Sequence, residues 1–374
     1  MKVHIAIYSP KAAGIMSAAI DQQADKIVVL FRAEDDVSGI RAVIQSRGMQ
    51  CQIVETNFDA DTFRQLIHDL IQQHQDDAIF FNASSGYRKL VLLAYEQCFF
   101  LDIPVFMVDK FTNTLHWLNQ KNGRDDHTLK TELKISEYLK LFNTQILNSN
   151  HNQPEPENRR KVTQWIITNL HSHLREISSL NHIAMMADNK HRARLNNHQL
   201  RDNTLMGLLE ELQAAGQLKI KKKQVEFTDD ESRFFCNGGW LEDHVYAELY
   251  GLRSKRPGIS DVSKGLVITR SQGKVKNEID VIAMANNRLH IIECKTSKME
   301  KSSKAKNTAS SAIYRLGTLK SVAGGLSGKA MLISFQPLSR HTLSRAKDLG
   351  IYCCSHLQLT RLRDHLYRFF DQDF

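Results

Sequence analysis

Residues 275–296, VKNEIDVIAMANNRLHIIECKT, contain two apolar runs that meet at Asn286 and Asn287. Asparagine tolerates the positive φ angles that tight turns require, so this pair predicts a hairpin turn between two antiparallel strands. We expect this hairpin to be the centre of the fold, because the most informative polar residues of the chain lie on it.

The polar side chains of the hairpin are predicted to share one face. Counting outward from the turn places Asp280 opposite Glu293, and Glu278 opposite Lys295. Side chains alternate between the two faces of a strand, so Glu293 and Lys295 point to the same side. The other face is expected to be core and carries Ile279, Val281, Ile292 and Cys294.

Asp280 and Glu293 form a candidate metal site. Directly opposed carboxylates lie about 5 Å apart and repel each other, so a cation between them would stabilise the pair. Hard oxygen ligands beside an ammonium group suit Mg²⁺ or Mn²⁺ better than zinc. A bound metal of this kind would ionise a water and polarise a phosphoryl oxygen, while Lys295 stabilises charge on the attacked phosphate. Asp280, Glu293 and Lys295 are therefore candidate catalytic residues for phosphodiester hydrolysis. The alternative is a solvated hairpin face with a salt bridge.

Composition and charge narrow the possible classes of protein. The chain of 374 residues is long enough for two or three domains. Its 50 Lys and Arg against 41 Asp and Glu give a formal charge of +9, which fits a polyanionic partner but also a merely soluble protein. The six cysteines include no C-x-x-C pair, so no zinc site is indicated and the thiols are expected to be reduced. Without a signal peptide or a membrane-spanning run, we expect a cytoplasmic protein and no membrane partner.

The first part of the chain alternates short apolar runs with helical patterns. The runs are rich in Ile, Val and Phe and lie at residues 3–8, 26–31, 49–55, 78–81 and 104–108. Between them, the apolar residues of 62–73 recur at the spacing of a helix. This alternation predicts a parallel sheet covered by helices on both faces, with an antiparallel edge near Trp117.

Two loops of this region are candidate ligand-binding segments. One follows the first strand and contains Ser9, Pro10 and Lys11. The other leads from the fourth strand into a helix and contains Asn82, Ser84, Ser85, Gly86 and Arg88. Both lie at carboxyl ends of strands, where doubly wound sheets bind ligands, and N–H groups at a helix start attract phosphate. The first loop lacks the G-x-G-x-x-G pattern of NAD-binding folds, and a serine-capped helix start is the alternative for the second.

A polar linker at residues 150–158 precedes a predicted winged helix-turn-helix. Helices are expected at residues 161–174, 180–186 and 203–215, followed by a basic wing of two strands at 218–222 and 224–227. Winged helices usually contact DNA, and phosphates would suit His191, Arg192, Arg194 and Arg201. A spacer between the flanking domains is the alternative. We favour it because the last region has nucleic-acid contacts of its own.

The last region, residues 232–374, surrounds the hairpin with further elements. Gly238 and Gly239 open a helix before it, and three glycines precede a strand at residues 330–335. Basic residues flank the hairpin on both sides and fit a nucleic-acid groove, although charge runs are often only solvated surface. Tyr314 and Arg315 lie on the next helix, from which they could reach a substrate. A helix at residues 341–349 and a strand at 351–353 are expected to follow.

The hairpin resembles the core of the PD-(D/E)XK nucleases, whose motif is matched by Asp280, Glu293 and Lys295. Its surroundings narrow the match: the helix opens with residues 238–242, GGWLE, and Gly324-Gly325 and Gly328-Lys329 precede the next strand. Together these features resemble the nucleases with a CARF (CRISPR-associated Rossmann fold) sensor that accompany type III CRISPR systems. The resemblance covers the whole chain, most closely in the last third.

This resemblance implies an α/β protein of three domains. They are a Rossmann-like CARF sensor domain at residues 1–148, a winged helix-turn-helix at 158–229, and a restriction-endonuclease-like nuclease domain at 232–374. It also implies that Glu242 is a helix-borne metal ligand beside Asp280 and Glu293. A surface glutamate is the alternative for Glu242.

In the resembled family, a cyclic oligoadenylate switches on cleavage of DNA and RNA, and the sensor carries an N-x-T-G-G-T-K type motif. Asn82 and Gly86 match this motif, Ser84 replaces Thr and Arg88 replaces Lys, whereas Ser85 and Tyr87 depart from it. A cyclic tetra-adenylate ring and an isologous homodimer can share two-fold symmetry, so we expect one ring to bind two copies of the chain. Binding of the ring is expected to change the relative orientation of the two copies, and this change is expected to reach the hairpins through the winged-helix segment.

Two other functions compete with a ligand-gated nuclease. The first is a ligand-sensing transcription regulator with a winged helix and an inactive nuclease domain, which the intact Asp280, Glu293 and Lys295 argue against. The second is a repair or restriction-like enzyme that needs no activator, which would leave the first α/β domain without a purpose.

Overall fold

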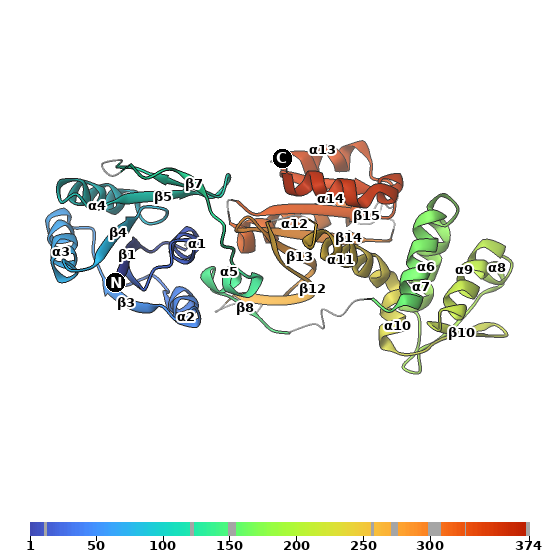
Figure 1. Ribbon diagram of the computed structural model, residues 1–374. Coiled ribbons are helices and arrows are strands. Elements are labelled where there is room, and N and C mark those ends of the chain that lie inside the picture. Colours follow the sequence, from blue (N-terminus) through green and yellow to red (C-terminus); the bar gives the residue numbers. More distant parts are fainter. Residues whose placement is uncertain are drawn as a thin grey trace.

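The computed structural model describes residues 1–10, 13–119, 123–148, 155–255, 258–270, 276–297, 308–325 and 327–371. They form three domains in a row (Figure 1). The N-terminal domain lies at one end, the C-terminal domain at the centre, and the predicted winged-helix segment at the other end. We call this last segment the middle domain, because it lies between the other two in the sequence. The favoured interpretation of this segment as a spacer between the other two domains is therefore wrong.

The N-terminal domain contains a seven-stranded sheet with the order β3-β2-β1-β4-β5-β6-β7. Its strands are β1 (Lys2–Ile7), β2 (Lys26–Phe31), β3 (Gln50–Glu55), β4 (Ala78–Asn82), β5 (Val105–Asp109), β6 (Thr114–Trp117) and β7 (His127–Thr128). The first five are parallel, and β6 pairs antiparallel with β5, as the sequence predicts.

Helices cover both faces of this sheet. Their bounds are α1 (Ala13–Asp21), α2 (Ser38–Ser46), α3 (Ala60–Gln73) and α4 (Arg88–Phe100). Apolar residues of α1 and α2 pack on one face, and those of α3 and α4 pack on the other. The domain therefore has the doubly wound arrangement of a Rossmann-like fold, with its loops 9–14 and 82–88 at the same edge.

The C-terminal domain contains a six-stranded mixed sheet with the order β16-β15-β14-β13-β12-β8. Its strands are β8 (Thr144–Ile146), β12 (Ile259–Arg270), β13 (Asn277–Ala285), β14 (Arg288–Lys295), β15 (Lys329–Ser334) and β16 (Ile351–Ser355). Its helices are α10 (Asp230–Phe234), α11 (Trp240–Arg253), α12 (Thr308–Gly324), α13 (Arg340–Asp348) and α14 (Leu362–Asp371). Of these elements, β8, β12, α10 and α14 were not predicted from the sequence.

The hairpin β13–β14 has the predicted register. Pairs run from Val281 opposite Ile292 to Ala285 opposite Arg288, and both turn residues have positive φ, 50° at Asn286 and 55° at Asn287. The four predicted core residues of the hairpin are all buried. They do not share one core, however, because Ile279 packs in a different cluster from Val281. The change occurs beside Gly265 of β12, where a φ of 57° interrupts the regular alternation.

The boundary of the N-terminal domain lies earlier than the predicted residue 148. β8 pairs with β12 and is the edge strand of the C-terminal sheet. The helix before it, α5 (Ile135–Leu141), packs in a cluster that contains residues of both domains. The Tyr138 hydroxyl of α5 also donates to the Gly324 carbonyl over 2.9 Å. The two domains therefore share a hydrophobic core, and no free linker separates them.

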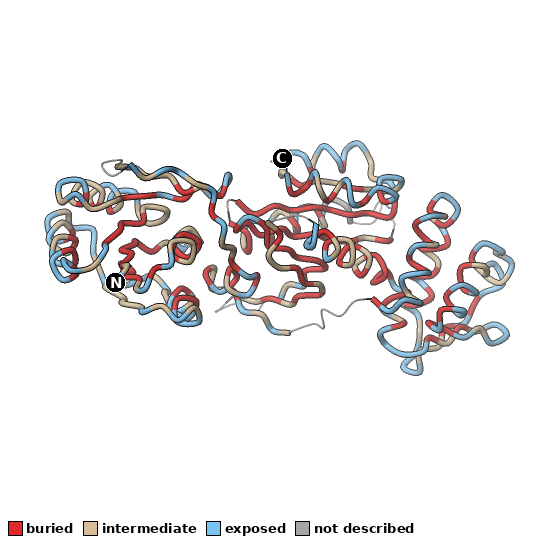
Figure 2. Tube along the Cα trace, viewed as in Figure 1, coloured by how far each residue is buried: buried red, intermediate tan, exposed pale blue. Residues whose placement is uncertain are grey.

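The middle domain has the predicted helices and wing, with shifted ends. Its elements are α6 (Glu157–Thr168), α7 (Leu174–Met185), β9 (Arg192–Arg194), α8 (Asn197–Leu200), α9 (Asn203–Ala214), β10 (Leu218–Lys221) and β11 (Gln224–Phe227). β9 was not expected and completes a three-stranded sheet of order β10-β11-β9. Buried positions continue from the central sheet into the helices of this domain (Figure 2), as one hydrophobic cluster.

No helix among the residues described is both long enough and apolar enough to cross a membrane.

Candidate active site and candidate ligand pocket

The polar residues of the hairpin meet at the carboxyl end of β14. Lys295 Nζ lies 2.7 Å from Glu293 Oε1 and 3.5 Å from Asp280 Oδ2. The predicted grouping of Asp280, Glu293 and Lys295 is therefore present in the structure. The predicted pairing of Lys295 with Glu278 is not, because Glu278 is exposed and Lys295 turns toward the two buried carboxylates.

Asp280 is fixed against the backbone of the neighbouring strand. The Cys294 N–H donates to Asp280 Oδ2 over 2.8 Å, just beyond Val281 and Ile292, the last recorded pair of the hairpin. Asp280 is only 8% exposed and Glu293 only 1%. A carboxylate held by a backbone donor keeps one orientation, so the hairpin presents its two acids in a preorganised arrangement.

Burial and crowding perturb the ionisation of this group. Burial and the charge of Glu293 raise the pKa of Asp280 to about 6. Burial and the nearby Asp280 raise the pKa of Glu242 to about 9. Burial lowers the pKa of Lys295, but Asp280 and Glu293 outweigh it, so this pKa lies above its ordinary value. Burial and mutual repulsion therefore disfavour the ionised forms of Glu242 and Asp280, while Lys295 stays cationic.

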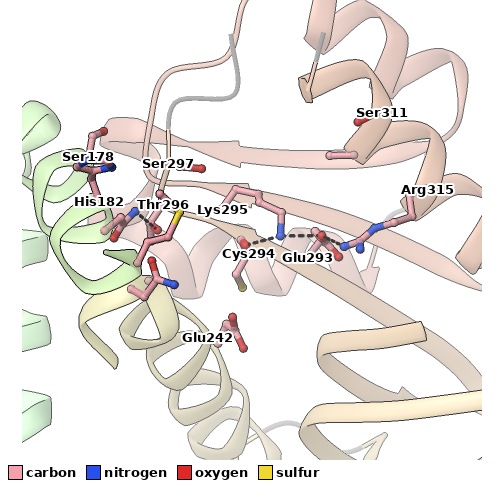
Figure 3. Close-up of a pocket in the computed structure, with 15 residues that line it drawn as sticks. Ser178, His182, Glu242, Glu293, Cys294, Lys295, Thr296, Ser297, Ser311 and Arg315 are labelled. Carbon is pink, nitrogen blue, oxygen red and sulfur yellow. Dashed lines mark hydrogen bonds and ion pairs between the residues drawn. The ribbon is translucent and has the colours of Figure 1, made fainter. Parts of the chain in front are cut away.

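Arg315 of α12 joins Asp280, Glu293 and Lys295. The sequence placed it on the helix after the hairpin, from which it was expected to be able to reach a substrate. Its guanidinium donates to Glu293 Oε1 from a side chain that is 57% exposed. Glu293 thus lies between Lys295 and Arg315 (Figure 3). Tyr314 instead lies under Arg345, whose guanidinium carbon is 5.2 Å from the centre of the ring.

A cavity of about 780 Å³ opens over these residues. On one side it is lined by Glu242, Glu293, Lys295 and Arg315 of the C-terminal domain (Figure 3). On the other side it is lined by Ser178, Asn181, His182 and Met185 of α7, in the middle domain. Sequence reasoning missed these α7 residues, because nothing in the sequence indicates that α7 docks beside β14.

Side-chain hydrogen bonds fix α7 against the C-terminal domain. Asn181 Nδ2 donates to Thr296 Oγ1 over 2.9 Å, and Gln336 Nε2 donates to the Leu174 carbonyl over 2.6 Å. Thr296 Oγ1 also lies 2.4 Å from where a Cβ on Gly238 would stand, and Gly238 has a φ of 108°. Glycine is therefore required where the predicted helix opening passes the end of β14.

The carboxylates suit a hard divalent cation in donor type. Glu242, Asp280 and Glu293 offer oxygen ligands, and a bound cation would stabilise the ionised forms of Glu242 and Asp280, whose pKa values are raised by burial and by neighbouring carboxylates. Within the described part of the chain, however, no three His, Cys, Asp or Glu side chains form a closed group around one point. Lys295 and Arg315 both pair with the same oxygen of Glu293, Oε1.

The two candidate ligand loops also come together. A second cavity, of about 260 Å³, is lined by Ser9, Gly14, Ser84, Ser85 and Gly86. A Cβ on Gly14 would stand 2.8 Å from Ser84 Cβ, so the loops are in direct contact. The prediction that both loops share one edge of the sheet is thus confirmed in geometry, while ligand binding by them stays a prediction.

The remaining predicted ligand residues do not line this cavity. Asn82 is buried, and its side chain fastens the loops by donating to the Gly14 carbonyl over 3.3 Å and accepting from Ser84 N–H over 3.0 Å. Pro10 and Arg88 are exposed outside the cavity, and Lys11 lies outside the described residues. Lys110 does line it. Sequence reasoning missed Lys110, although it follows β5 at the same carboxyl edge.

The opposite wall of the second cavity belongs to the C-terminal domain and includes the hairpin turn. Asn287 lines the cavity together with Gly324 and Ser327. Asn287 Nδ2 donates to Asn113 Oδ1 over 2.9 Å, and Asn287 Oδ1 accepts from the Leu133 N–H over 2.9 Å. The hairpin that carries the acidic residues therefore has its turn anchored in the N-terminal domain.

Comparison with known protein families supports a nuclease domain in the last region of the chain. Residues 229–372 match the family of Card1-like endonuclease domains. A search of curated proteins gives no match.

Two solved structures are similar over essentially the whole chain. Protein VC1899 from Vibrio cholerae is 26% identical, with a TM-score of 0.89 over 99% of this chain and 98% of that one. Can2 from Sulfobacillus thermosulfidooxidans, solved in complex with cyclic tetra-adenylate, is 20% identical, with a TM-score of 0.81 over 100% of both chains. The endonuclease match agrees with the resemblance drawn from the sequence for the last region of the chain, and the two structures show that the whole chain shares their fold.

Proposed function

We propose that this chain, whose residues 229–372 form a Card1-like endonuclease domain, is a metal-dependent nuclease activated by a cyclic oligoadenylate in antiviral CRISPR defence. Its substrate is DNA, RNA or both. The observation that carries the proposal is the buried acidic pair Asp280 and Glu293 with Lys295 between them, of which Glu293 and Lys295 line a cavity of about 780 Å³. Buried like charges are costly, and their presence in a cleft is typical of a catalytic site.

Each polar residue has a distinct role in this proposal. Asp280, Glu293 and Glu242 would hold Mg²⁺ or Mn²⁺, which supplies an ionised water and charge neutralisation at the phosphate. Lys295 remains cationic because its pKa is raised, so it can stabilise the charge that develops on the attacked phosphate. Arg315, which is largely exposed, orients Glu293 and can also meet an incoming phosphate.

The second cavity is proposed as one half of the activator site. Its volume of about 260 Å³ is below the roughly 300–1,000 Å³ usual for small-molecule pockets, so it can accommodate only part of a tetranucleotide ring. A second copy of the chain would supply the other half across a two-fold axis. The complex of the similar Can2 with cyclic tetra-adenylate supports this choice of ligand.

Activation is proposed to pass directly from this cavity to the catalytic hairpin. Asn287 is part of the cavity wall and of the turn that joins β13 to β14. The route through the winged-helix segment, expected from the sequence, is longer, since the middle domain lies on the far side of the C-terminal domain (Figure 1). For a clear response, the activator must favour the active arrangement by ~3–5 kcal/mol.

One experiment separates this function from its competitors. Purified protein is incubated with plasmid DNA and with RNA, with and without Mn²⁺ and cyclic tetra-adenylate. We expect cleavage only when both are present. Cleavage without the nucleotide would indicate a repair or restriction-like enzyme. Binding of DNA without cleavage in every mixture would indicate a ligand-responsive regulator.

A further inference from the structure

The middle domain forms one wall of the cleavage cavity, which gives it a place in substrate binding. Ser178 and His182 lie four residues apart on α7, and Met185 follows on the same face. Met185 and Met186 are each 63% exposed at the end of this helix. Flexible apolar side chains at the mouth of a polar cavity suit the face of an unpaired base.

A basic groove begins directly after this wall. A third cavity, of about 820 Å³, is lined by Asp188, Arg192, Arg194, Lys221, Lys222, Lys223 and Gln224. Only two residues lie between Met185 in the first cavity and Asp188 in the third, so the two are at most about 11 Å apart along the chain. The cleavage cavity and the basic groove are therefore neighbours on the surface.

The groove carries cations that the protein does not neutralise. Its one acid, Asp188, is bonded to Arg192 over 3.3 Å, and Lys221 is paired with Glu226. Within the described residues, Arg194 and Lys223 have no acidic partner, and both are exposed. Exposed, unpaired cations beside a nuclease cavity suit the phosphates of a nucleic acid.

The distribution of charge on the middle domain favours binding of single-stranded nucleic acid over a duplex. In a winged helix, the helix before the wing usually enters the major groove of DNA. Here that helix is α9, which contains no Lys or Arg and exposes Glu210 and Glu211. These acids would repel duplex phosphates, whereas the basic groove lies on β9, β10 and β11 instead.

We propose that the substrate strand leaves the cleavage cavity over Met185 and continues as a single strand into the basic groove of the middle domain. This inference rests on the proposed nuclease function. Phosphates would contact Arg194 and Lys223, and an unstacked base would lie against Met185. The middle domain then acts as a substrate-binding element, which explains its position beside the active site and away from the sensor.

The test compares two charge-removing variants. Arg194→Gln with Lys223→Gln removes two groove cations, and Lys161→Gln with Lys347→Gln removes two exposed lysines that line none of the three cavities. Activated enzyme is assayed with Mn²⁺ on single strands of about 6 and about 20 nucleotides, as DNA and as RNA. We expect the groove variant to raise KM for the long strand roughly tenfold, with kcat and the KM for the short strand unchanged. The control variant should match the wild type.

A binding measurement keeps the two proposals apart. Fluorescence anisotropy without metal gives the affinity for a labelled 20-nucleotide strand at several salt concentrations. The groove variant should lower the slope of log affinity against log salt by about 1.4, since each phosphate contact contributes about 0.7 on a single strand. Loss of this slope in a protein that cleaves nothing would support the groove and contradict the nuclease proposal. If the groove variant has the same slope and the same KM for the long strand as the wild type, the proposal that the groove binds the strand is wrong. A preference for duplex that depends on Lys223 would also overturn it.

Discussion

At the scale of single residues, the active site is defined by how buried charges balance. Glu293 is almost fully buried and pairs through Oε1 with both Lys295 and Arg315, while Asp280 is held by a backbone N–H. Three ion pairs connect the four charged side chains in series, from Asp280 through Lys295 and Glu293 to Arg315, so removing one alters its neighbours. Substitutions that keep the shape and remove only the charge are therefore the informative ones.

Asp280→Asn should abolish cleavage while preserving the fold. Asparagine can still accept from the Cys294 N–H, so the loss reports the missing charge. We expect the rate to fall by at least about 100-fold, with activator binding unchanged. Glu278→Gln is the matched control, since Glu278 lies two residues away on the same strand but is exposed. If both variants cleave at the wild-type rate, Asp280 has been assigned wrongly.

Lys295→Ala should reduce the rate more than it affects the metal. Lys295 lies against both carboxylates, so its removal leaves them more negative and should leave Mn²⁺ affinity equal or higher. The maximal rate should still fall by about 100-fold, because the charge on the phosphate loses its partner. A Mn²⁺ titration of the cleavage rate tests this. Weaker metal binding at an unchanged maximal rate would make Lys295 a structural residue. EDTA should stop cleavage by the wild type.

At the scale of elements, the hairpin β13–β14 joins the two sites. Its turn lies in the wall of the candidate activator cavity, and its open end carries Asp280, Glu293 and Lys295. A paired hairpin transmits a shift of its turn along both strands, because side chains in packed cores cannot yield independently.

Asn287→Gly should uncouple activation from activator binding. Glycine accepts the positive φ of the turn but loses the side-chain bonds to Asn113 and Leu133. We expect the ratio of cleavage rates with and without saturating activator to fall about tenfold, corresponding to ~1.4 kcal/mol of coupling. Asn286→Gly, at the adjacent turn position, should keep the wild-type ratio. Equal ratios in both variants would exclude the turn from the coupling path.

Residues 150–154 of the predicted linker 150–158 lie outside the described residues, and Glu155, which follows them, is buried and responds to pH. Glu155 is only 5% exposed, and burial and the nearby Asp243 raise its pKa to about 7. Between the ordinary pKa of a glutamate and pH 7, the unfolded chain releases this proton before the folded chain does, so the group lowers stability as pH rises. Glu155→Gln retains an oxygen for the Thr163 hydroxyl.

This variant should raise the melting temperature at pH 8 and leave it unchanged at pH 4. At pH 4 the carboxyl group is largely protonated in both states, so replacing it has little effect. Glu157→Gln provides the comparison, because Glu157 is exposed and paired with Lys161. If Glu155→Gln raises the melting temperature equally at both pH values, the charge of Glu155 is not the cause of the stabilisation.

At the scale of the whole molecule, the three domains form a row with the nuclease in the centre (Figure 1). The C-terminal domain shares one hydrophobic core with the N-terminal domain and another with the middle domain. Shared cores make rigid junctions, so the three domains of one chain are expected to keep their arrangement on activation. The change within each chain is then a small shift of the hairpin, and it accompanies a change in how two copies meet.

Calorimetry should give one cyclic tetra-adenylate ring per two chains. The cavity in one chain is too small for a whole ring, so each chain is expected to bind half of it. Lys110→Ala should weaken binding about tenfold or more, because Lys110 lines the cavity and would lose a phosphate contact. Arg88→Ala should weaken it less, since Arg88 lies outside the cavity. One ring per chain, or a larger effect at Arg88, would contradict this arrangement.

The sequence alone determined the hairpin, its register and its acidic residues. These features depend on local rules: the turn preference of Asn286 and Asn287, the alternation of side chains along a strand, and the repulsion of facing carboxylates. The order of strands and helices in the N-terminal domain follows from the same kind of local periodicity.

Only the tertiary structure decided which distant surfaces meet. The docking of α7 beside the active site, the entry of β8 into the C-terminal sheet and the contact of Asn287 with the N-terminal domain each join segments over 100 residues apart. Such contacts form because together they bury the most apolar surface. A local sequence pattern shows which face of an element is apolar, but it does not show which other element covers that face. The same reason explains why Arg88 matched a motif yet lies outside the cavity that Lys110 lines.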